Sequence, residues 1–245
     1  MTGIQQWNIR GIKVSSNSFH KVKKCISILE NVQKTNILSI QETHLASNDE
    51  IPKRLLNFNH LYHILPSHAP VNDKGAGIIL FINKTEELIE SAELVPGRLV
   101  YAKIQNKITS EIRNIFSFYA KSLITKSEIK QILTVFDEKL KETNLCGIII
   151  CGDFNFVTSL LDRNSNSFTS VDSNYRHEWG KLQLDFGLVD SFRVTNPKRR
   201  FYTYTHTNGT SRARLDRIYL SKDLIGKILS TNFEYASKSD HKIVN

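Results

Sequence analysis

Residues 147–155 read GIIICGDFN, and this stretch decides the fold. The run at 148–151 is apolar without a break, which is typical of a β-strand that is covered on both faces. Gly152 then leads to a carboxylate at Asp153 and an amide at Asn155. Because side chains held by strands are positioned more accurately than side chains on free loops, this strand end predicts a functional site.

The rest of the chain supplies more strands than helices. The patterns predict strands at 4–11, 36–43, 75–82, 98–104 and 114–120, helices at 18–34, 127–142 (capped by Ser127) and 175–188 (closed by Gly187), and a polar loop at 158–174. Several of these strands are apolar on both faces and therefore need cover on both sides. We expect an α/β fold, a four-layer α/β sandwich of two packed mixed β-sheets flanked by helices.

Composition limits the class of protein. The 245 residues carry 33 Lys and Arg against 24 Asp and Glu, a formal net charge of +9. Such a balance attracts nucleic acid or anionic membranes, but it also suits a soluble protein with neither partner. No linker or repeat is visible, so we expect one domain over residues 1–245. Three cysteines without a CxxC pair indicate buried thiols in a reducing compartment, and the apolar runs are too short to span a bilayer.

Polar side chains stand at the ends of several predicted strands. They are Asn8, Gln41, Glu42, Tyr119, Asp153 and Asn155, followed by Asp216 in a predicted hairpin and by Asp240 and His241. Any one of them is more often a solvated loop residue or a helix cap than a catalytic group. Together they suit phosphodiester cleavage, which requires a cation on the phosphate oxygens, an activated water and help for the leaving group. Mg²⁺ prefers one or two carboxylates plus waters, and Glu42 is the best candidate for that ligand.

The order of the motifs is more specific than any one of them. The motifs are WNIRG (7–11), IQET (40–43), FYA (118–120), GDFN (152–155), LDRI (215–218) and SDH (239–241). In this order they resemble the endonuclease/exonuclease/phosphatase superfamily. The sequence is most similar to the endonuclease domain of LINE-type (non-LTR) retrotransposons, which is apurinic/apyrimidinic-endonuclease-like. The segment 179–206 looks like the one those domains carry before a DNA-facing hairpin, and the resemblance implies a DNase I-like fold.

The resemblance also implies roles for the matched residues. Glu42 is then the metal-binding glutamate, with Asn8 beside it, and Mg²⁺ is the expected cofactor, for which Mn²⁺ can substitute. Asp153 orients or deprotonates the attacking water. Tyr119 contacts the scissile phosphate or the leaving oxygen, and His241 is cationic or hydrogen-bonded to the phosphate.

Three further residues complete the implied catalytic set. Asn155 steadies Asp153 and touches the phosphate, while Asp216 poises His241. Asp240 adds a second contact to metal or water. The predicted metal ligands are therefore Glu42, Asn8 and Asp240, and the choice between one and two metal ions stays open.

Two positions depart from the family's pattern. Arg10 stands where many abasic-site enzymes have an aspartate that LINE-type domains often lack, so it favours the retrotransposon interpretation. Lys121 replaces the usual proline after the tyrosine motif, which should change the following loop and leaves Tyr119 available. The sequence stops at SDHKIVN (239–245), where a strand normally continues, so we expect the N-terminal part of a longer polyprotein.

A hairpin is predicted over 201–221, because Asn208-Gly209 is a strong two-residue turn signal. Counting outward from this turn, alternate residues of both arms share one face. These residues are Thr203, Thr205, Arg212, Arg214 and Asp216. The first four suit contacts with phosphates and the minor groove, as do Arg10 and Lys121 near the predicted groove. The alternative is an ordinary exposed hairpin whose threonines reflect β propensity.

Three hypotheses follow. The first is a Mg²⁺-dependent endonuclease that acts in the nucleus and nicks double-stranded DNA to leave a 3′-hydroxyl. That end would start target-primed reverse transcription by the reverse transcriptase in the remainder of the polyprotein. The second keeps the fold but makes the chain a repair enzyme for abasic sites. The third is a catalytically silent DNA-binding module, against which the intact set of candidate residues argues. No membrane partner is expected.

Overall fold

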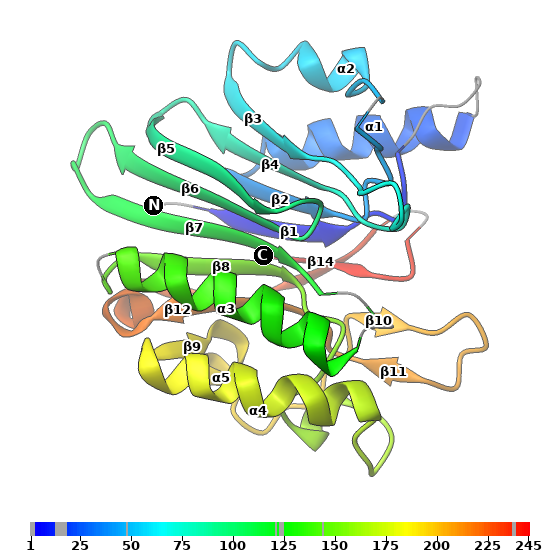
Figure 1. The fold of residues 1–245 in the computed structure, drawn as a ribbon. Helices are drawn as coiled ribbons and strands as arrows, with labels where there is room; N and C mark the ends of the chain where they lie inside the picture. The colour runs from blue at the N-terminus through cyan, green and yellow to red at the C-terminus, as the bar shows by residue number, and fades with distance from the viewer. Residues whose placement is uncertain are drawn as a thin grey trace.

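Two six-stranded sheets face each other at the centre of the molecule. The computed structural model describes residues 3–12, 19–47, 49–120, 122, 125–143, 145–236 and 239–245, with the backbone alone for 19–22. In spatial order, the first sheet contains β13 (Phe233–Tyr235), β14 (Lys242–Val244), β1 (Ile4–Asn8), β2 (Ile37–Gln41), β4 (Ile78–Asn83) and β3 (Tyr62–Ser67). The second contains β5 (Glu86–Val95), β6 (Leu99–Asn106), β7 (Ile112–Tyr119), β8 (Ile148–Asp153), β12 (Asp216–Ser221) and β9 (Leu188–Asp190). A separate pair, β10 (Tyr204–Thr205) and β11 (Arg212–Ala213), projects from one end (Figure 1).

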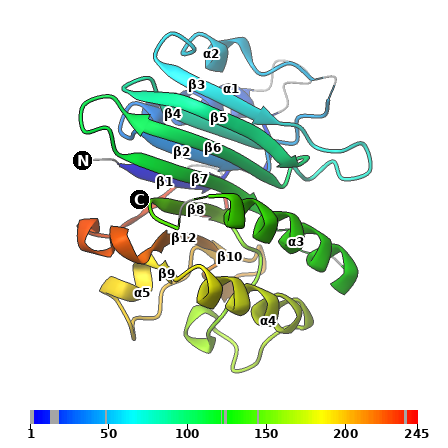
Figure 2. The same cartoon turned by 60° about the vertical axis from the view of Figure 1, so that its left-hand side comes forward.

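Helices cover the outer faces of the sheets. On the first sheet these are α1 (Phe19–Val32) and α2 (Lys53–Leu56), and on the second α3 (Lys126–Glu142) and α4 (Ser170–Asp185), which lie side by side (Figure 2). The short elements are α5 (Ser191–Thr195) and the 3-10 helices η1 (Leu160–Asp162) and η2 (Lys222–Lys227). Both sheets are mixed, since β1–β2 and β7–β8 are parallel and their other neighbours are antiparallel. The predicted four-layer α/β sandwich is confirmed.

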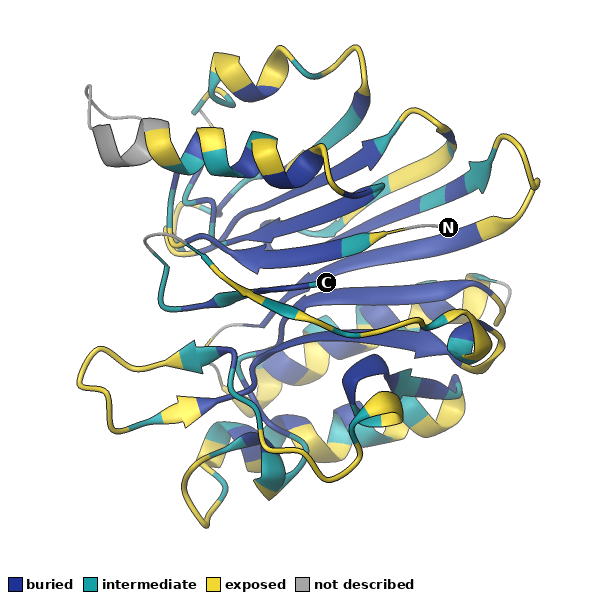
Figure 3. Cartoon of the chain, turned by 180° about the vertical axis from the view of Figure 1, so that it is seen from behind, coloured by how far each residue is buried: buried dark blue, intermediate teal, exposed yellow. Residues whose placement is uncertain are grey.

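Apolar side chains fill the spaces between the layers. Leu80 and Ile82 of β4 face Ala102 of β6 between the two sheets, whereas Phe81 points to the side of the first sheet that the helices cover. A strand covered on both sides has to be apolar on both faces. Figure 3 shows that most strands of both sheets are buried and that the loop of the β10–β11 hairpin is exposed. Among the described residues, no helix has both the length and the apolar character needed to cross a bilayer.

Some element boundaries differ from the prediction. Helix α3 is capped by Thr125 and not by Ser127, because the Thr125 side chain and Glu128 exchange the two hydrogen bonds of a capping box. Helix α4 begins at Ser170, inside the stretch expected to be loop, and Thr169 caps it in the same way. Both caps lie upstream of the first apolar residue of the helix, so hydrophobic spacing alone places these helix starts too late.

The hairpin turn is longer than predicted. The His206 and Gly209 amides donate to the carbonyl oxygens of Ser211 and His206 at 2.8 and 2.7 Å, so residues 207–210 form a four-residue loop. Gly209 has a φ of +71°, but Asn208 has no positive φ, which excludes the two-residue turn that requires both. The register of the arms is nevertheless the predicted one, since Thr205 lies opposite Arg212.

Gly152 lets strands β7 and β8 approach closely just before Asp153. Its φ is +156°, and a Cβ at this position would lie 1.8 Å from the Phe118 carbonyl oxygen. Only glycine fits such a contact. The glycine of GDFN is therefore required by packing. Asp153 follows directly after the point where the two buried parallel strands approach closely.

Candidate active site

Strand topology brings the predicted polar strand ends to one edge of the two sheets. Asn8 ends β1, and Glu42 follows β2, which runs parallel to β1. In the second sheet, Asp153 lies opposite Tyr119 on the parallel strand β7 and opposite Asp216 on the antiparallel strand β12. Residues that lie far apart in the sequence therefore meet between the sheets.

Asp153 is the centre of this group and has no exposed surface. Asn8 Nδ2, from the other sheet, donates to Asp153 Oδ2 at 2.7 Å, and the Asn155 amide donates to Oδ1 at 2.9 Å. Burial, and then repulsion from Asp216, raises the pKa of Asp153 to about 7. A carboxylate with such a pKa can take a proton from water near neutral pH.

His241 and Asp216 form a buried pair beside Asp153. His241 Nδ1 lies 2.8 Å from Asp216 Oδ2 and 4.0 Å from Asp153 Oδ2. Burial favours the neutral imidazole, but attraction to Asp216 and Asp153 outweighs it and raises the pKa of His241 to about 9. The ring is therefore a cation at neutral pH, with one N–H fixed on Asp216.

Gln6 completes this pair, and the sequence prediction missed it. Its Nε2 donates to Asp216 Oδ1 at 2.7 Å from the opposite sheet, and Gln6 is fully buried. The Asp216 amide in turn donates to Thr203 Oγ1 at 3.1 Å. The two carboxylate oxygens of Asp216 are thus held by Gln6 and His241. Strand alternation is the signal that points to Gln6, because Gln6 and Asn8 share a face of β1.

Glu42 and Tyr119 form a second pair. Tyr119 Oη donates to Glu42 Oε1 at 2.7 Å, and the side chains of His44 and Arg10 approach Glu42 Oε2 to 3.6 and 3.9 Å. Burial favours the protonated acid, but attraction from three polar neighbours outweighs it and lowers the pKa of Glu42 to about 2. These neighbours are His44, Asn8 and Tyr119. Burial and then the Glu42 charge raise the pKa of Tyr119, so its hydroxyl remains a donor.

The site opens on the side of Glu42 and Asp240. Their side chains keep 16% and 14% of their surface exposed, whereas Asp153 and Asp216 keep none. Arg10 stands at this opening, and its Nη1 lies 2.5 Å from Asp240 Oδ2. Asp240 Oδ1 is buried and has no hydrogen-bond partner among the described residues. The metal contact expected of Asp240 stays a prediction, and in this structure its Oδ2 forms an ion pair with Arg10.

Backbone strain gathers around the opening. Four non-glycine residues there have positive φ angles of 49°, 53°, 58° and 50°, namely Arg10, Glu42, His44 and Asn155. Each such conformation costs on the order of 1–3 kcal/mol and persists only where other contacts fix it. Asn155 Nδ2, for example, donates to the Ala120 carbonyl oxygen at 2.7 Å. The amide expected to touch a phosphate therefore also ties the end of β8 to the end of β7.

The donor set fits a hard divalent cation. Ligand atoms of Asp153, Asp216 and His241 lie within 4.8 Å of one another. The ionised Glu42 has an oxygen, Oε2, whose distances to His44 and Arg10 exceed a normal hydrogen bond. Mg²⁺ takes one or two carboxylates and completes its shell with water. Glu42 is the more accessible ligand, because His241 Nδ1 is already bonded to Asp216.

The hairpin presents fewer of the predicted DNA-contacting residues than expected. Thr205 and Arg212 are exposed on its two arms, and the Arg10 side chain is 49% exposed at the site opening. Thr203 and Arg214 are each only 1% exposed, which corrects the expectation that they contact DNA. Lys121 lies outside the described residues.

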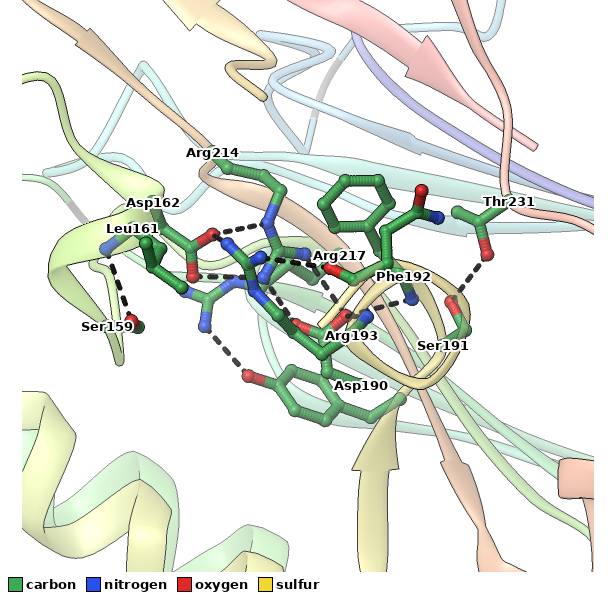
Figure 4. A network of polar contacts seen from close by, with 12 residues as sticks. Ser159, Leu161, Asp162, Asp190, Ser191, Phe192, Arg193, Arg214, Arg217 and Thr231 are labelled. Atoms are coloured by element: carbon green, nitrogen blue, oxygen red, sulfur yellow. Dashed lines mark hydrogen bonds and ion pairs between the residues drawn. The ribbon is translucent and has the colours of Figure 1, made fainter. Parts of the chain in front are cut away.

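Arg214 belongs to a buried ionic cluster beneath the hairpin, the Arg214 cluster of Asp162, Asp190, Arg193 and Arg214 (Figure 4). Arg214 Nε lies 2.7 Å from Asp162 Oδ1, and its Nη2 lies 2.6 Å from Asp190 Oδ2. Arg193 pairs with Asp162 as well. Strand alternation does not reveal that Asp162 of η1 and Asp190, which caps α5, bind this side chain.

Comparison with known proteins identifies the family of this chain and supports its fold. A model of the endonuclease/exonuclease/phosphatase family matches residues 6–241. The transposon TX1 uncharacterized 149 kDa protein of Xenopus laevis is 26% identical over 216 residues, which cover 84% of this chain but only 15% of that protein.

Two solved structures support the fold. An AP endonuclease from Archaeoglobus fulgidus has a TM-score of 0.79 at 21% identity, with 100% of this chain and 98% of that chain covered. The endonuclease domain of TRAS1, a telomere-specific non-LTR retrotransposon, has a TM-score of 0.69 at 14% identity, with 100% and 98% covered. These likenesses confirm the fold class predicted from the sequence.

Proposed function

The chain belongs to the endonuclease/exonuclease/phosphatase family and is a phosphodiester-hydrolysing nuclease, and we propose that it is a Mg²⁺-dependent endonuclease that nicks one strand of double-stranded DNA. The observation that carries this proposal is the meeting of three carboxylates and a histidine at one edge of the two sheets. They are Glu42, Asp153, Asp216 and His241. The raised pKa values of Asp153 and His241 provide a proton acceptor and a cation near neutral pH.

Each side chain has a role that its contacts support. Asp153 accepts the proton of the attacking water, while Asn8 and the Asn155 amide keep its carboxylate in place. His241, held by Asp216 through Nδ1, offers its other ring nitrogen to a phosphate oxygen. In-line attack on the phosphate leaves a 3′-hydroxyl on one product.

The opening of the site provides the remaining groups. A bound Mg²⁺ supplies positive charge to the phosphate oxygens, and Glu42 with Asn8 would hold it. Tyr119 keeps its proton and is bonded to Glu42, so its hydroxyl can orient that carboxylate or donate to the leaving oxygen.

DNA is the proposed substrate because basic and hydroxyl side chains extend from the site. The net charge of +9 favours a polyanion. Thr205 and Arg212 are exposed on the hairpin next to the site, and residues 198–200, a Lys-Arg-Arg run, are exposed before it. The backbone amide of Thr205 donates to the Asp240 carbonyl oxygen at 3.2 Å, so the hairpin is attached to the site itself.

We further propose that the domain is the N-terminal part of a retrotransposon polyprotein, and that its nick primes reverse transcription in the nucleus. The similarity to the TX1 transposon protein supports this context. The alternative, repair of abasic sites, is supported by the likeness to AP endonuclease structures. Arg10 favours the first, because it replaces an aspartate found in many abasic-site enzymes.

A plasmid assay tests the proposed activity. We expect supercoiled DNA to become nicked circles with Mg²⁺ but not with EDTA, and a DNA polymerase to extend the nicks without phosphatase treatment. Asp153→Asn should be inactive under the same conditions. Absence of nicking by the wild-type domain in Mg²⁺ and in Mn²⁺ would refute the proposal.

A matched pair of oligonucleotide duplexes separates the two biological contexts. One duplex is intact, and the other carries a single abasic analogue in the same sequence. Retrotransposon priming predicts cleavage of the intact duplex at sequence-dependent positions. Cutting that greatly favours the abasic analogue would instead establish the repair function.

A further inference from the structure

We propose that the Arg10 guanidinium takes the place of a second cation in the active site, so that the site binds one divalent metal ion and not two. The inference rests on the metal-dependent function proposed above and adds the number of ions. It starts from the contacts of Arg10 with two expected metal ligands. Its Nη1 lies 2.5 Å from Asp240 Oδ2, and its Nε lies 3.9 Å from Glu42 Oε2.

Arg10 is held in this place by its main chain. Its amide donates to Asn8 Oδ1 at 3.1 Å, and its carbonyl oxygen accepts from Lys24 Nζ at 2.9 Å. Its φ of 49° is a strained conformation that these contacts maintain. The side chain is half-exposed, but the direction in which it leaves the backbone is fixed, unlike that of an ordinary surface arginine.

The position of the guanidinium competes with a second ion. Two-metal sites hold their ions about 3.5–4 Å apart. An ion on Glu42 Oε2 would have Arg10 as a close cationic neighbour, because Nε approaches the same oxygen to 3.9 Å. A second ion on Asp240 would also have to break the 2.5 Å ion pair with Arg10. Repulsion and loss of that pair both oppose it.

Asp240 retains the capacity to bind an ion once Arg10 is removed. Its Oδ1 is buried and has no hydrogen-bond partner among the described residues. A buried carboxylate oxygen without a donor is costly and gains from a cation. Removing the guanidinium would leave Asp240 Oδ2 without its ion-pair partner next to Glu42, and carboxylate oxygens are the donors that Mg²⁺ and Mn²⁺ prefer.

Counting bound Mn²⁺ without DNA tests the inference independently of cleavage. Equilibrium binding followed by electron paramagnetic resonance of free Mn²⁺ should give one ion per wild-type chain. Arg10→Ala and Arg10→Gln, which both remove the positive charge, should each bind a second, weaker ion. Adding Asp240→Ala to Arg10→Ala should return the count to one. Arg176→Ala, which removes an exposed arginine from α4, should still bind one.

The numbers of bound Mn²⁺ ions distinguish a failure of this inference from a failure of the proposed metal-dependent function. Two ions on the wild-type chain, or one ion on both folded Arg10 variants, would overturn the inference and leave the nuclease intact. No ion on the wild-type chain would refute metal dependence and the inference together. Circular dichroism spectra that match the wild type establish that the variants are folded.

Discussion

The active site and the Arg214 cluster both bury charged side chains, and they neutralise them in different ways. In the Arg214 cluster, Asp162 and Asp190 are paired directly with guanidinium groups. In the active site, Asp153 is bonded to amides, and its contact with the His241 ring is 4.0 Å long. Both carboxylates of the first cluster are paired with cations, whereas Asp153 of the active site depends on neutral donors.

Protonation reflects this difference. Burial by itself would raise the pKa of both Asp162 and Asp153. At Asp162, pairing with Arg214 outweighs burial, and the net pKa is lowered. At Asp153, repulsion from Asp216 adds to burial, and the net pKa is raised. The charge of the neighbouring side chains, and not the extent of burial, therefore decides the direction in which the pKa of each carboxylate moves. Paired buried charge fixes the fold, while incompletely paired buried charge remains reactive.

The largest expected effect is on catalysis by the incompletely paired cluster. Asp153→Asn should lower the nicking rate by about 10²–10⁴-fold, because it removes the proton acceptor. The same variant should lose little stability, since removal of the repelled charge offsets the one accepted hydrogen bond that is lost when an NH2 group replaces an oxygen. Single-turnover nicking and urea unfolding measure the two quantities. A marked loss of stability would remove the contrast between the clusters.

The Arg214 cluster should show the reverse behaviour. Arg214→Met should lower the free energy of unfolding by about 3–5 kcal/mol, because it leaves Asp162 and Asp190 buried without their main cation. The matched control is Arg212→Met, two residues away on the exposed hairpin, which should change stability by less than about 0.5 kcal/mol. Equal unfolding curves for the two variants would show that the Arg214 cluster contributes little.

Gln6 links the two sheets at the site and provides a finer test. Gln6→Met keeps the volume but removes the donor to Asp216, so the kcat for nicking should fall about tenfold, equivalent to about 1.4 kcal/mol for a hydrogen bond to a charged group. KM should stay constant if Gln6 acts only through the Asp216–His241 pair. A change in KM with unaltered kcat would instead place Gln6 in substrate binding.

The active site also predicts a pH dependence of stability. The folded-state pKa values of Asp153 and His241 lie above their ordinary values, at about 7 and about 9, so this stabilisation is present at low pH and is lost as pH rises through those values. In EDTA, the melting temperature should therefore fall from pH 6 to pH 9 by a few degrees, or on the order of 1 kcal/mol. Asp153→Asn/His241→Gln is the comparison variant. An equally steep fall in that variant would assign the effect to other groups.

The smallest effect is expected at the hairpin. Arg212→Ala removes an exposed charge, so it should weaken DNA binding modestly and lower the slope of log affinity against log salt by about 1. Fluorescence anisotropy at several salt concentrations measures that slope. An unchanged slope would place the DNA on another face, and Arg214→Lys, which keeps the buried charge, should leave the slope untouched.

Strong periodicity made much of the fold predictable. Strand β8 was found because its apolar residues run without a break, and helix α3 because its apolar residues repeat with the helical period. Strand β5 was missed because it is an edge strand with mostly exposed residues, including Glu90 and Glu93, and its pairing with β6 holds it in place. A strand that depends on its neighbour leaves little pattern in its own sequence.

The site was predictable to the extent that its motifs could be matched in order. Contacts between the two sheets were not, because they depend on how the sheets face each other. The bond of Gln6 to Asp216 is of this kind. The burial of Arg214 was likewise hidden, since the covering elements come from distant parts of the sequence.

The anchoring of the hairpin sets limits on protein engineering. The Thr203 hydroxyl accepts a hydrogen bond from the Asp216 amide, and its carbonyl oxygen accepts one from the Lys242 amide. The base of the hairpin is therefore part of the active-site framework. A segment transplanted from a relative to redirect target choice would therefore be tolerated only at the hairpin loop, residues 207–210. A graft that began at Thr203 would exchange part of the catalytic framework together with the hairpin loop.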